Sequence, residues 1–170
     1  MATAKPNNGQ LPTGFVSPFR RVEMKGTHDD LLACAAIICG KSIDDAKKAA
    51  VALGMPSNGP FCVDDELFRK VVFNLSQLIV DEYRDLTTVA ALPNVAVLCL
   101  VHDKYGETYR HVVFHHVRAT DTTPAFSYVI DPANWIDDKH QVTSDLRHLD
   151  MEPAWYLEIK QSLDGASPRK

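Results

Sequence analysis

The sequence lacks an apolar segment long enough to cross a membrane, a start typical of secreted proteins, and an excess of positive charge. Its longest apolar run, LLACAAIICG, is about half of the roughly 20 residues that a membrane helix needs. No apolar segment follows a basic N-terminus, so a standard signal peptide is missing. The 18 Lys and Arg residues are outnumbered by 22 Asp and Glu residues, which leaves a formal net charge of −4 and no basic stripe for phosphates. We therefore expect a cytoplasmic protein without membrane or nucleic-acid partners, although export by machinery that reads other signals is compatible with the sequence.

Cysteine is scarce, and its spacing argues against two kinds of site. The four cysteines, none of which belongs to a C-x-x-C pair, are Cys34, Cys39, Cys62 and Cys99. Neither a zinc site nor a disulfide framework is expected from this pattern. A chain of 170 residues that is 45% hydrophobic buries a sizeable core without such supports. We expect no metal and no cofactor, and nothing in the sequence specifies an oligomeric state.

The first 25 residues hold few periodic apolar positions but several prolines and glycines. This composition predicts a mobile leader over 1–25 that becomes ordered near 15–22. A single domain is expected over 26–162, followed by a frayed tail over 163–170.

Helical patterns fill the first half of the domain. Asp29 or Asp30 is a good N-cap for the run LLACAAII, Gly40 ends that run, and Ser42 caps a second helix. A third helix is predicted to start at Asp64 or Asp65. The candidates for its buried face are Leu67, Val71, Phe73, Leu75 and Leu78.

Strand patterns fill the second half. The expected strands, each a short apolar or alternating run, cover 95–102, 110–117, 125–131 and 154–160. A short helix is expected within 87–94, before the first of them. Helices first and hairpin-linked strands later predict an α+β fold in which the helices pack on an antiparallel sheet.

Three separated places form an ordered set of chemical groups. They are the helix start over 29–34, His111 at the beginning of a strand, and Asp131 at the end of the next strand. A helix N-terminus stabilises a thiolate, a histidine moves its proton, and an acid orients the imidazole. The order of these groups is typical of a thiol peptidase of papain-like architecture.

Over roughly 27–135 the sequence resembles the papain-like peptidases related to the peptidase domain of bacteriocin-exporting ABC transporters. The segments RHVVF and YVIDPANW match two of the family's motifs, an H-[FYV]-V-V strand and a D-P pair. The resemblance implies a papain-like fold, with His111 as the base and Asp131 as its orienting partner.

The first motif departs from the family's D-C-x-x-A-C/S-x-A pattern. Aligning Ala33, Cys34 and Ala36 with the end of that motif places Asp30 where the family has its nucleophilic cysteine. The family's oxyanion-hole glutamine, five or six residues earlier, is also missing, because Met24 and Lys25 stand there.

Two functional hypotheses follow from this departure. In the first, the domain is a pseudoenzyme: Asp30 caps the helix, pairs with His111 and raises its pKa, and the former cleft binds a peptide or protein partner. In the second, the domain is an active cysteine peptidase or amide hydrolase that uses Cys34, His111 and Asp131, with His28 as the oxyanion donor. A helix that begins at Asp30 would place Cys34 about one turn too late for the second hypothesis.

Other residues are assigned to binding rather than to chemistry. Trp135 follows the D-P pair and is a candidate wall of the cleft. The loop 55–62, with Asn58, is a candidate lid that faces the ligand. A metal cluster of His28, Asp30, His111 and Asp131 is not expected, since ordinary capping and pairing explain each residue.

Overall fold

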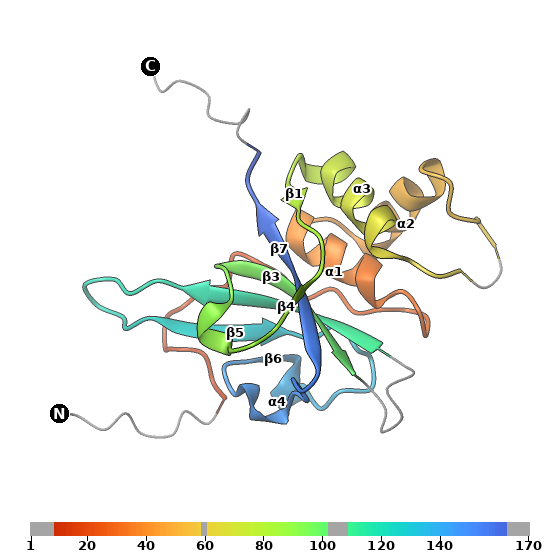
Figure 1. Ribbon diagram of the computed structural model, residues 1–170. Helices are drawn as coiled ribbons and strands as arrows, with labels where there is room; N and C mark the ends of the chain where they lie inside the picture. Colours follow the sequence, from red (N-terminus) through yellow and green to blue (C-terminus); the bar gives the residue numbers. More distant parts are fainter. Residues whose placement is uncertain (1–8, 59–60, 102–108, 163–170) are drawn as a thin grey trace, which may run out of the picture.

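The computed structural model describes residues 9–58, 61–101 and 109–162 (Figure 1). Its helical elements are α1 (Asp30–Cys39), α2 (Ile43–Ala52), α3 (Asp65–Ser76), η1 (Val89–Ala91), α4 (Asp138–Gln141) and η2 (Leu146–His148). Its strands are β1 (Ile79–Val80), β2 (Arg84–Asp85), β3 (Val95–Val101), β4 (Tyr109–Val117), β5 (Phe126–Ile130), β6 (Val142–Thr143) and β7 (Ala154–Lys160). The chain is therefore α+β, with the three long helices in its first half and an antiparallel sheet in its second half.

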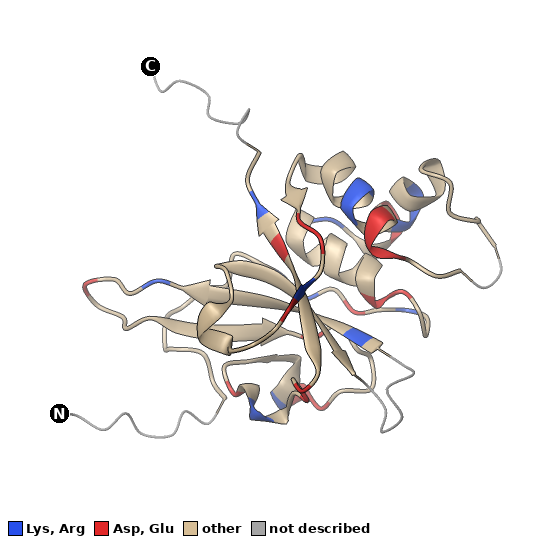
Figure 2. Cartoon of the chain, in the orientation of Figure 1, with Lys and Arg blue, Asp and Glu red and all other residues tan. Residues whose placement is uncertain are grey.

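The strands are arranged in the order β1-β7-β3-β4-β5-β6, and β2 also pairs with β7. Strands β3, β4 and β5 are successive antiparallel neighbours, as hairpin-linked strands are expected to be. The last strand, β7, returns to pair with β3, and on its other side it pairs with the short strands β1 and β2. Figure 2 shows that these central strands carry few charges, whereas α2 and α3 carry many.

The two faces of the sheet are covered differently. Helices α1 and α3 pack on one face and α2 packs on them; Val97, Val113 and Leu157 of the sheet join their core cluster. The opposite face carries Leu98 and Phe114 and is covered by short segments that include η1 and η2. Because side chains alternate along a strand, neighbouring residues of β4 belong to different layers.

The local signals are confirmed for the end of α1 and for the starts of α2 and α3, but Asp29, at the N-cap of α1, makes no side-chain capping hydrogen bond. Gly40 ends α1 with a positive φ of 64°, and Ser42 and Asp45 form the capping box of α2. Asp64 caps α3 by accepting a hydrogen bond from the Leu67 amide. The phase of α3 was predicted less well, since Phe73 is 49% exposed while Phe68 is fully buried.

The part of the N-terminal segment that the structure describes is packed against the domain. Phe15 and Phe19 contact the core beneath the helices, and Met24 is buried. The hydroxyl of Thr143 donates a hydrogen bond to the carbonyl of Gly9, at 2.9 Å. The expected leader therefore contacts the sheet from Gly9 onward.

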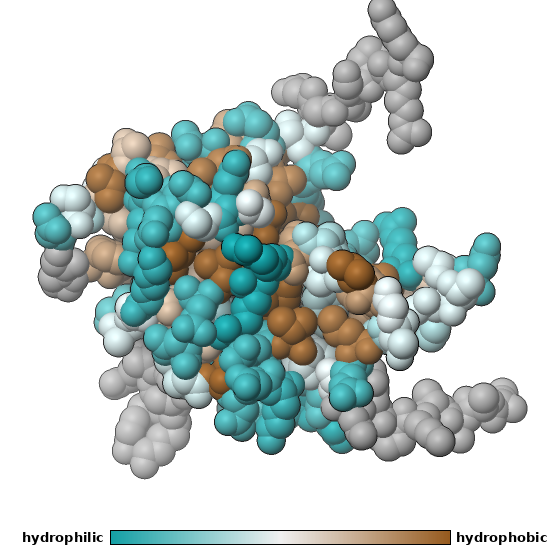
Figure 3. All heavy atoms as spheres, turned by 180° about the vertical axis from the view of Figure 1, so that it is seen from behind, coloured by the Kyte–Doolittle hydropathy of each residue, from teal (hydrophilic) through white to brown (hydrophobic). Residues whose placement is uncertain are grey.

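The surface is mixed in polarity. On the face seen in Figure 3, hydrophobic atoms reach the surface in several places between hydrophilic ones. Over the described ranges 9–58, 61–101 and 109–162, every helix is too short or too polar to cross a bilayer.

Candidate functional site

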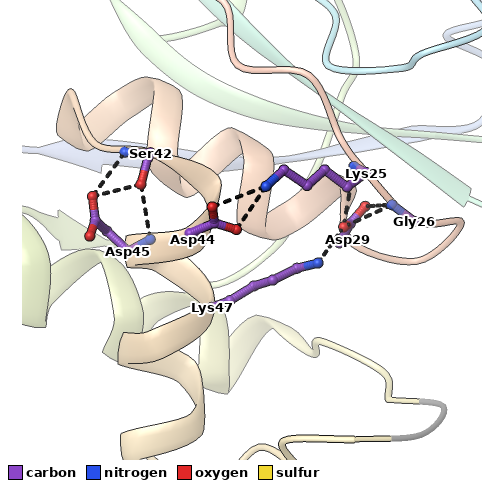
Figure 4. Close-up of polar contacts among 7 residues, drawn as sticks. All are labelled: Lys25, Gly26, Asp29, Ser42, Asp44, Asp45 and Lys47. Carbon is purple, nitrogen blue, oxygen red and sulfur yellow. Dashed lines mark hydrogen bonds and ion pairs between the residues drawn. The ribbon is translucent and has the colours of Figure 1, made fainter.

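The loop before α1 is held by Asp29 (Figure 4). The side chain of this residue is almost fully buried and accepts hydrogen bonds from the amides of Lys25 and Gly26, at 3.3 Å and 3.0 Å. Lys47 of α2 lies 3.0 Å from the same carboxylate. These contacts fix the loop that delivers the next residue, Asp30, to the sheet.

Asp30 begins α1, and its carboxylate binds His111 of β4 twice. Oδ2 lies 2.7 Å from the imidazole Nδ1 and accepts a hydrogen bond from the backbone amide of His111 at 2.9 Å. The helix therefore presents an acid, rather than a thiol, to the histidine from its first turn. The His111 side chain is 10% exposed and that of Asp30 is 17% exposed.

The two side chains stabilise each other's charged forms. Burial opposes the charge on His111, but the hydrogen bond and the charge of Asp30 outweigh it and raise the pKa of the ring from 6.5 to about 9. Burial likewise opposes the charge on Asp30, but the bond and charge of His111 hold the pKa of its carboxyl below the ordinary value. At neutral pH the contact is an ion pair of imidazolium and carboxylate.

The other ring nitrogen of His111 binds Tyr83, which lies in the segment between β1 and β2. Its Nε2 is 3.0 Å from the Tyr83 hydroxyl, so an Asp–His–Tyr chain of hydrogen bonds crosses three elements. Cys99 of β3 is the direct cross-strand neighbour of His111 and also contributes to the raised pKa of the ring. Burial raises the pKa of the Tyr83 hydroxyl, which keeps it protonated.

This chain lies in the wall of a pocket of about 970 Å³. Two tyrosines and two tryptophans line the pocket, and the ring centroids of Tyr109 and Trp155 lie 5.9 Å apart in an edge-to-face arrangement. The lining residues are Met24, Thr27, His28, Asp30, Leu31, Cys62, Val63, Asp64, Asp65, Tyr83, Cys99, Tyr109, Arg110, His111, Trp135 and Trp155. The volume is in the range of pockets that bind small molecules or short peptide segments.

Asp131 does not take the place that the resemblance implied. Ile130 pairs with Val113 and shares a face with His111, so the next residue, Asp131, belongs to the opposite face. Its carboxylate lies 3.0 Å from Arg110 Nη1 and accepts a hydrogen bond from the Ala133 amide. In the described part of the chain Asp30 is the acid bound to His111, because the strand register turns Asp131 away from it.

Cys34, a residue of α1, belongs to the core cluster and is fully buried. It does not appear among the described residues that line the pocket. Burial, together with the charges of Asp30 and Asp131, raises the pKa of its thiol well above the ordinary value. This surrounding is the opposite of the one that activates a nucleophilic cysteine.

The remaining predicted residues are divided between the pocket and the surface. His28 and Trp135 line the pocket, and Trp135 is half exposed. Asn58 is exposed, and among the described contacts its side chain reaches only the neighbouring Ser57. Residues 59–60 of the predicted lid lie outside the described part of the chain.

Sequence reasoning missed Tyr83, Cys99 and Trp155. Tyr83 lies between two very short strands, which leave no periodic pattern, and Cys99 is in a continuous apolar run that hides which face it occupies. Cys99 can be assigned to the same face as His111 only once the pairing register of β3 with β4 is known. No group of three or more metal-ligating side chains is found within 9–58, 61–101 and 109–162.

No protein-family model, no curated protein and no solved structure matches the chain.

Proposed function

We propose that the chain is a papain-like peptidase-fold domain without peptidase activity, which binds a peptide or protein partner in the pocket beside His111. The observation that carries the proposal is the bond between Asp30 and His111 at the start of α1. In the resembled family that helix position holds the nucleophile, and a carboxylate is a poor nucleophile toward amides.

The chemistry around the histidine supports a binding role. A general base must accept a proton, but an imidazole that is charged at neutral pH and bound at both nitrogens has no lone pair to offer. Cys34, the nucleophile in the alternative hypothesis, lies in the core. We therefore favour the impaired domain over an active enzyme that uses Cys34, His111 and Asp131.

The pocket supports a peptide ligand. Its aromatic residues offer large apolar contact areas with few rotatable bonds, which is the composition of many peptide-binding surfaces. Trp135 and Tyr109 are each about half exposed, at 50% and 49%, and so are accessible to a partner.

The test combines a selection for binding with an assay for cleavage. A display library of random peptides is selected on the immobilised wild-type chain, and the enriched peptides are tested against Trp135→Ala and against Phe73→Ser. Phe73 is similarly exposed, on α3, and does not appear among the described pocket residues, so its variant is the matched control. We expect the enriched peptides to bind wild type and the control and to lose affinity for Trp135→Ala.

In the cleavage assay the same peptides are incubated with the chain and analysed by mass spectrometry. We expect all of them to remain intact, and a peptide-based electrophile that labels catalytic cysteines to leave Cys34 unmodified. Cleavage that the Cys34→Ala variant abolishes would instead establish the thiol enzyme. Selection of no peptide above the background of an unrelated protein would overturn the binding proposal.

A further inference from the structure

Asp30, His111 and Tyr83 form a hydrogen-bonded chain that ends at the pocket. Asp30 Oδ2 lies 2.7 Å from Nδ1 of the ring, and Nε2 lies 3.0 Å from the Tyr83 hydroxyl. The three residues come from α1, β4 and the β1–β2 segment, and all three line the pocket. The direction in which protons are donated along this chain decides what the pocket offers to a ligand.

The charged ring sets that direction. With both nitrogens protonated, Nδ1–H donates to Asp30 and Nε2–H donates to the Tyr83 oxygen. The Tyr83 oxygen is thus an acceptor in its bond to His111, and its own hydroxyl proton must be donated elsewhere. The side chain of Cys99, the cross-strand neighbour of His111, also interacts with the Tyr83 hydroxyl, and sulfur is a weak acceptor.

We propose that Tyr83 donates its hydroxyl proton to a backbone carbonyl of an uncharged peptide segment whose apolar side chain packs on the aromatic wall of the pocket. The proposal rests on the peptide-binding function proposed above and names the group that is recognised. An O–H that is itself bound to an imidazolium is a strengthened donor, because hydrogen bonds in a chain polarise one another. A ligand carbonyl is a better acceptor than the sulfur that it would replace.

The charges of the pocket favour a carbonyl over a carboxylate. Three carboxylates line it, from Asp30, Asp64 and Asp65, against the cations of Arg110 and His111. Both cations are already paired, Arg110 with Asp131 and His111 with Asp30. The described residues that line the pocket therefore carry a net negative charge and offer no unpaired cation to an entering carboxylate. A neutral carbonyl avoids this repulsion.

Loss of the His111 proton reverses the chain. A neutral ring that still donates from Nδ1 to Asp30 leaves Nε2 as an acceptor, and Tyr83 then donates inward to Nε2 rather than to the ligand. The titratable groups that face this chain, from α1, α3, β3 and β4, are Asp30, Cys34, Asp65, Cys99 and His111. Affinity for the carbonyl should therefore fall as the pH rises past the pKa of His111, about 9, while Tyr83 stays protonated.

The experiment measures binding of N-acetyl-phenylalanine amide, which carries carbonyl acceptors and one aromatic ring, by NMR titration of the full chain. The variants are Tyr83→Phe, which removes only the hydroxyl, and Tyr156→Phe, which removes a hydroxyl on the opposite face of the sheet, outside the described pocket lining. N-acetyl-phenylalaninate serves as the matched ligand with a carboxylate. Each titration is run at neutral pH and at about pH 10, on either side of the His111 transition.

We expect Tyr83→Phe to weaken binding of the amide about tenfold at neutral pH, the effect of one good hydrogen bond, and Tyr156→Phe to bind as wild type does. Raising the pH should weaken wild-type binding by a similar factor and leave Tyr83→Phe unchanged. The carboxylate ligand should bind more weakly than the amide. Asp30→Asn should resemble wild type at high pH, since the Asn oxygen still accepts from Nδ1–H while the ring becomes neutral.

Three results would overturn the inference: equal affinity of wild type and Tyr83→Phe, a wild-type affinity that does not change with pH, or no binding of the amide. None of them decides the proposed function, which is judged by the library selection. If library peptides bind wild type and Tyr83→Phe equally, the proposed binding function stands and only the role of Tyr83 as hydrogen-bond donor is refuted. A display selection that yields no peptide would remove the binding function itself.

Discussion

Arg110 and His111 are neighbours on β4, yet each binds a carboxylate on a different face of the sheet. His111 faces the helices and binds Asp30, and Arg110 faces the other layer and pairs with Asp131. Both members of the first pair line the pocket, and its histidine loses its charge as the pH rises through about 9. The second pair joins a permanent cation to an acid that is 1% exposed and is not among the described pocket residues. The comparison teaches that one acid is available for a functional role and the other is structural, although the motifs alone favoured the reverse.

Removing the structural acid should have the largest effect. In Asp131→Asn the Arg110 guanidinium, which is 13% exposed, loses its counter-charge. A buried charge left without its partner typically costs about 3–5 kcal/mol of unfolding free energy, so we expect a loss in that range by urea unfolding. Asp137→Asn is the control, because Asp137 is 74% exposed and 3.8 Å from Lys139, and its urea midpoint should match wild type. A midpoint for Asp131→Asn equal to that of the control would show that Arg110 does not depend on Asp131.

Stability should depend on pH through the pocket pair. The pKa of His111 is about 9 in the folded state and 6.5 ordinarily, so its contribution is fully present below about pH 6.5 and lost as the pH rises through about 9. A difference of this size corresponds to up to about 3 kcal/mol. Asp30 has a lowered pKa, so its contribution is present above about pH 3.8 and lost as the pH falls further. Urea unfolding across this range should show both losses, and a stability that is level from pH 6.5 to 9 would contradict the assigned pairing.

Removing the pocket acid should change the charge of His111. In Asp30→Asn burial acts on the ring without the charge of Asp30, so the pKa of His111 should fall from its raised value of about 9. We expect a loss of about 2 kcal/mol in unfolding free energy at neutral pH, the contribution of a hydrogen bond to a charged group. The measurement is an NMR titration of the imidazole signals. His115, whose pKa burial already lowers, is the internal reference and should titrate as in wild type.

A third acid, Asp29, should depend least on its cation. It accepts hydrogen bonds from two backbone amides besides its ion pair with Lys47, so Lys47→Met leaves it largely satisfied. We expect a loss of about 1 kcal/mol by urea unfolding, smaller than for Asp131→Asn. Lys25→Met removes a nearby lysine whose pairing with Asp44 is exposed, and it should leave the urea midpoint unchanged. A larger loss for Lys47→Met than for Asp131→Asn would reverse the comparison among the acids.

Much of the fold was predictable from local patterns. Ser42, Gly40 and Asp64 mark helix ends because each satisfies or frees backbone groups near its own position in the chain. The strand over 154–160 was recognised from its apolar run, and it is β7. Its position between β1 and β3 was not predictable, because pairing between distant segments leaves no local pattern.

The candidate site was predictable only in part. His111 and Asp30 were identified from motif order and from the departure at the helix start, and they bind each other. Asp131 was identified by the same reasoning but lies on the other face, since one residue along a strand reverses the direction of the side chain. Tyr83 was missed because it lies outside any regular element.

By itself, the sequence determined which groups are present and which helices hold them. An acid begins α1, a histidine occupies the strand RHVVF, and Cys34 lies one turn inside the helix. The tertiary structure decided which of these groups meet. Asp30 reaches His111, and Asp131 reaches Arg110, because the register of β5 against β4 and the packing of α1 on the sheet fix the direction of each side chain. Those choices depend on contacts between residues 21 and 81 positions apart in the chain (131 − 110 = 21; 111 − 30 = 81), which no local pattern encodes.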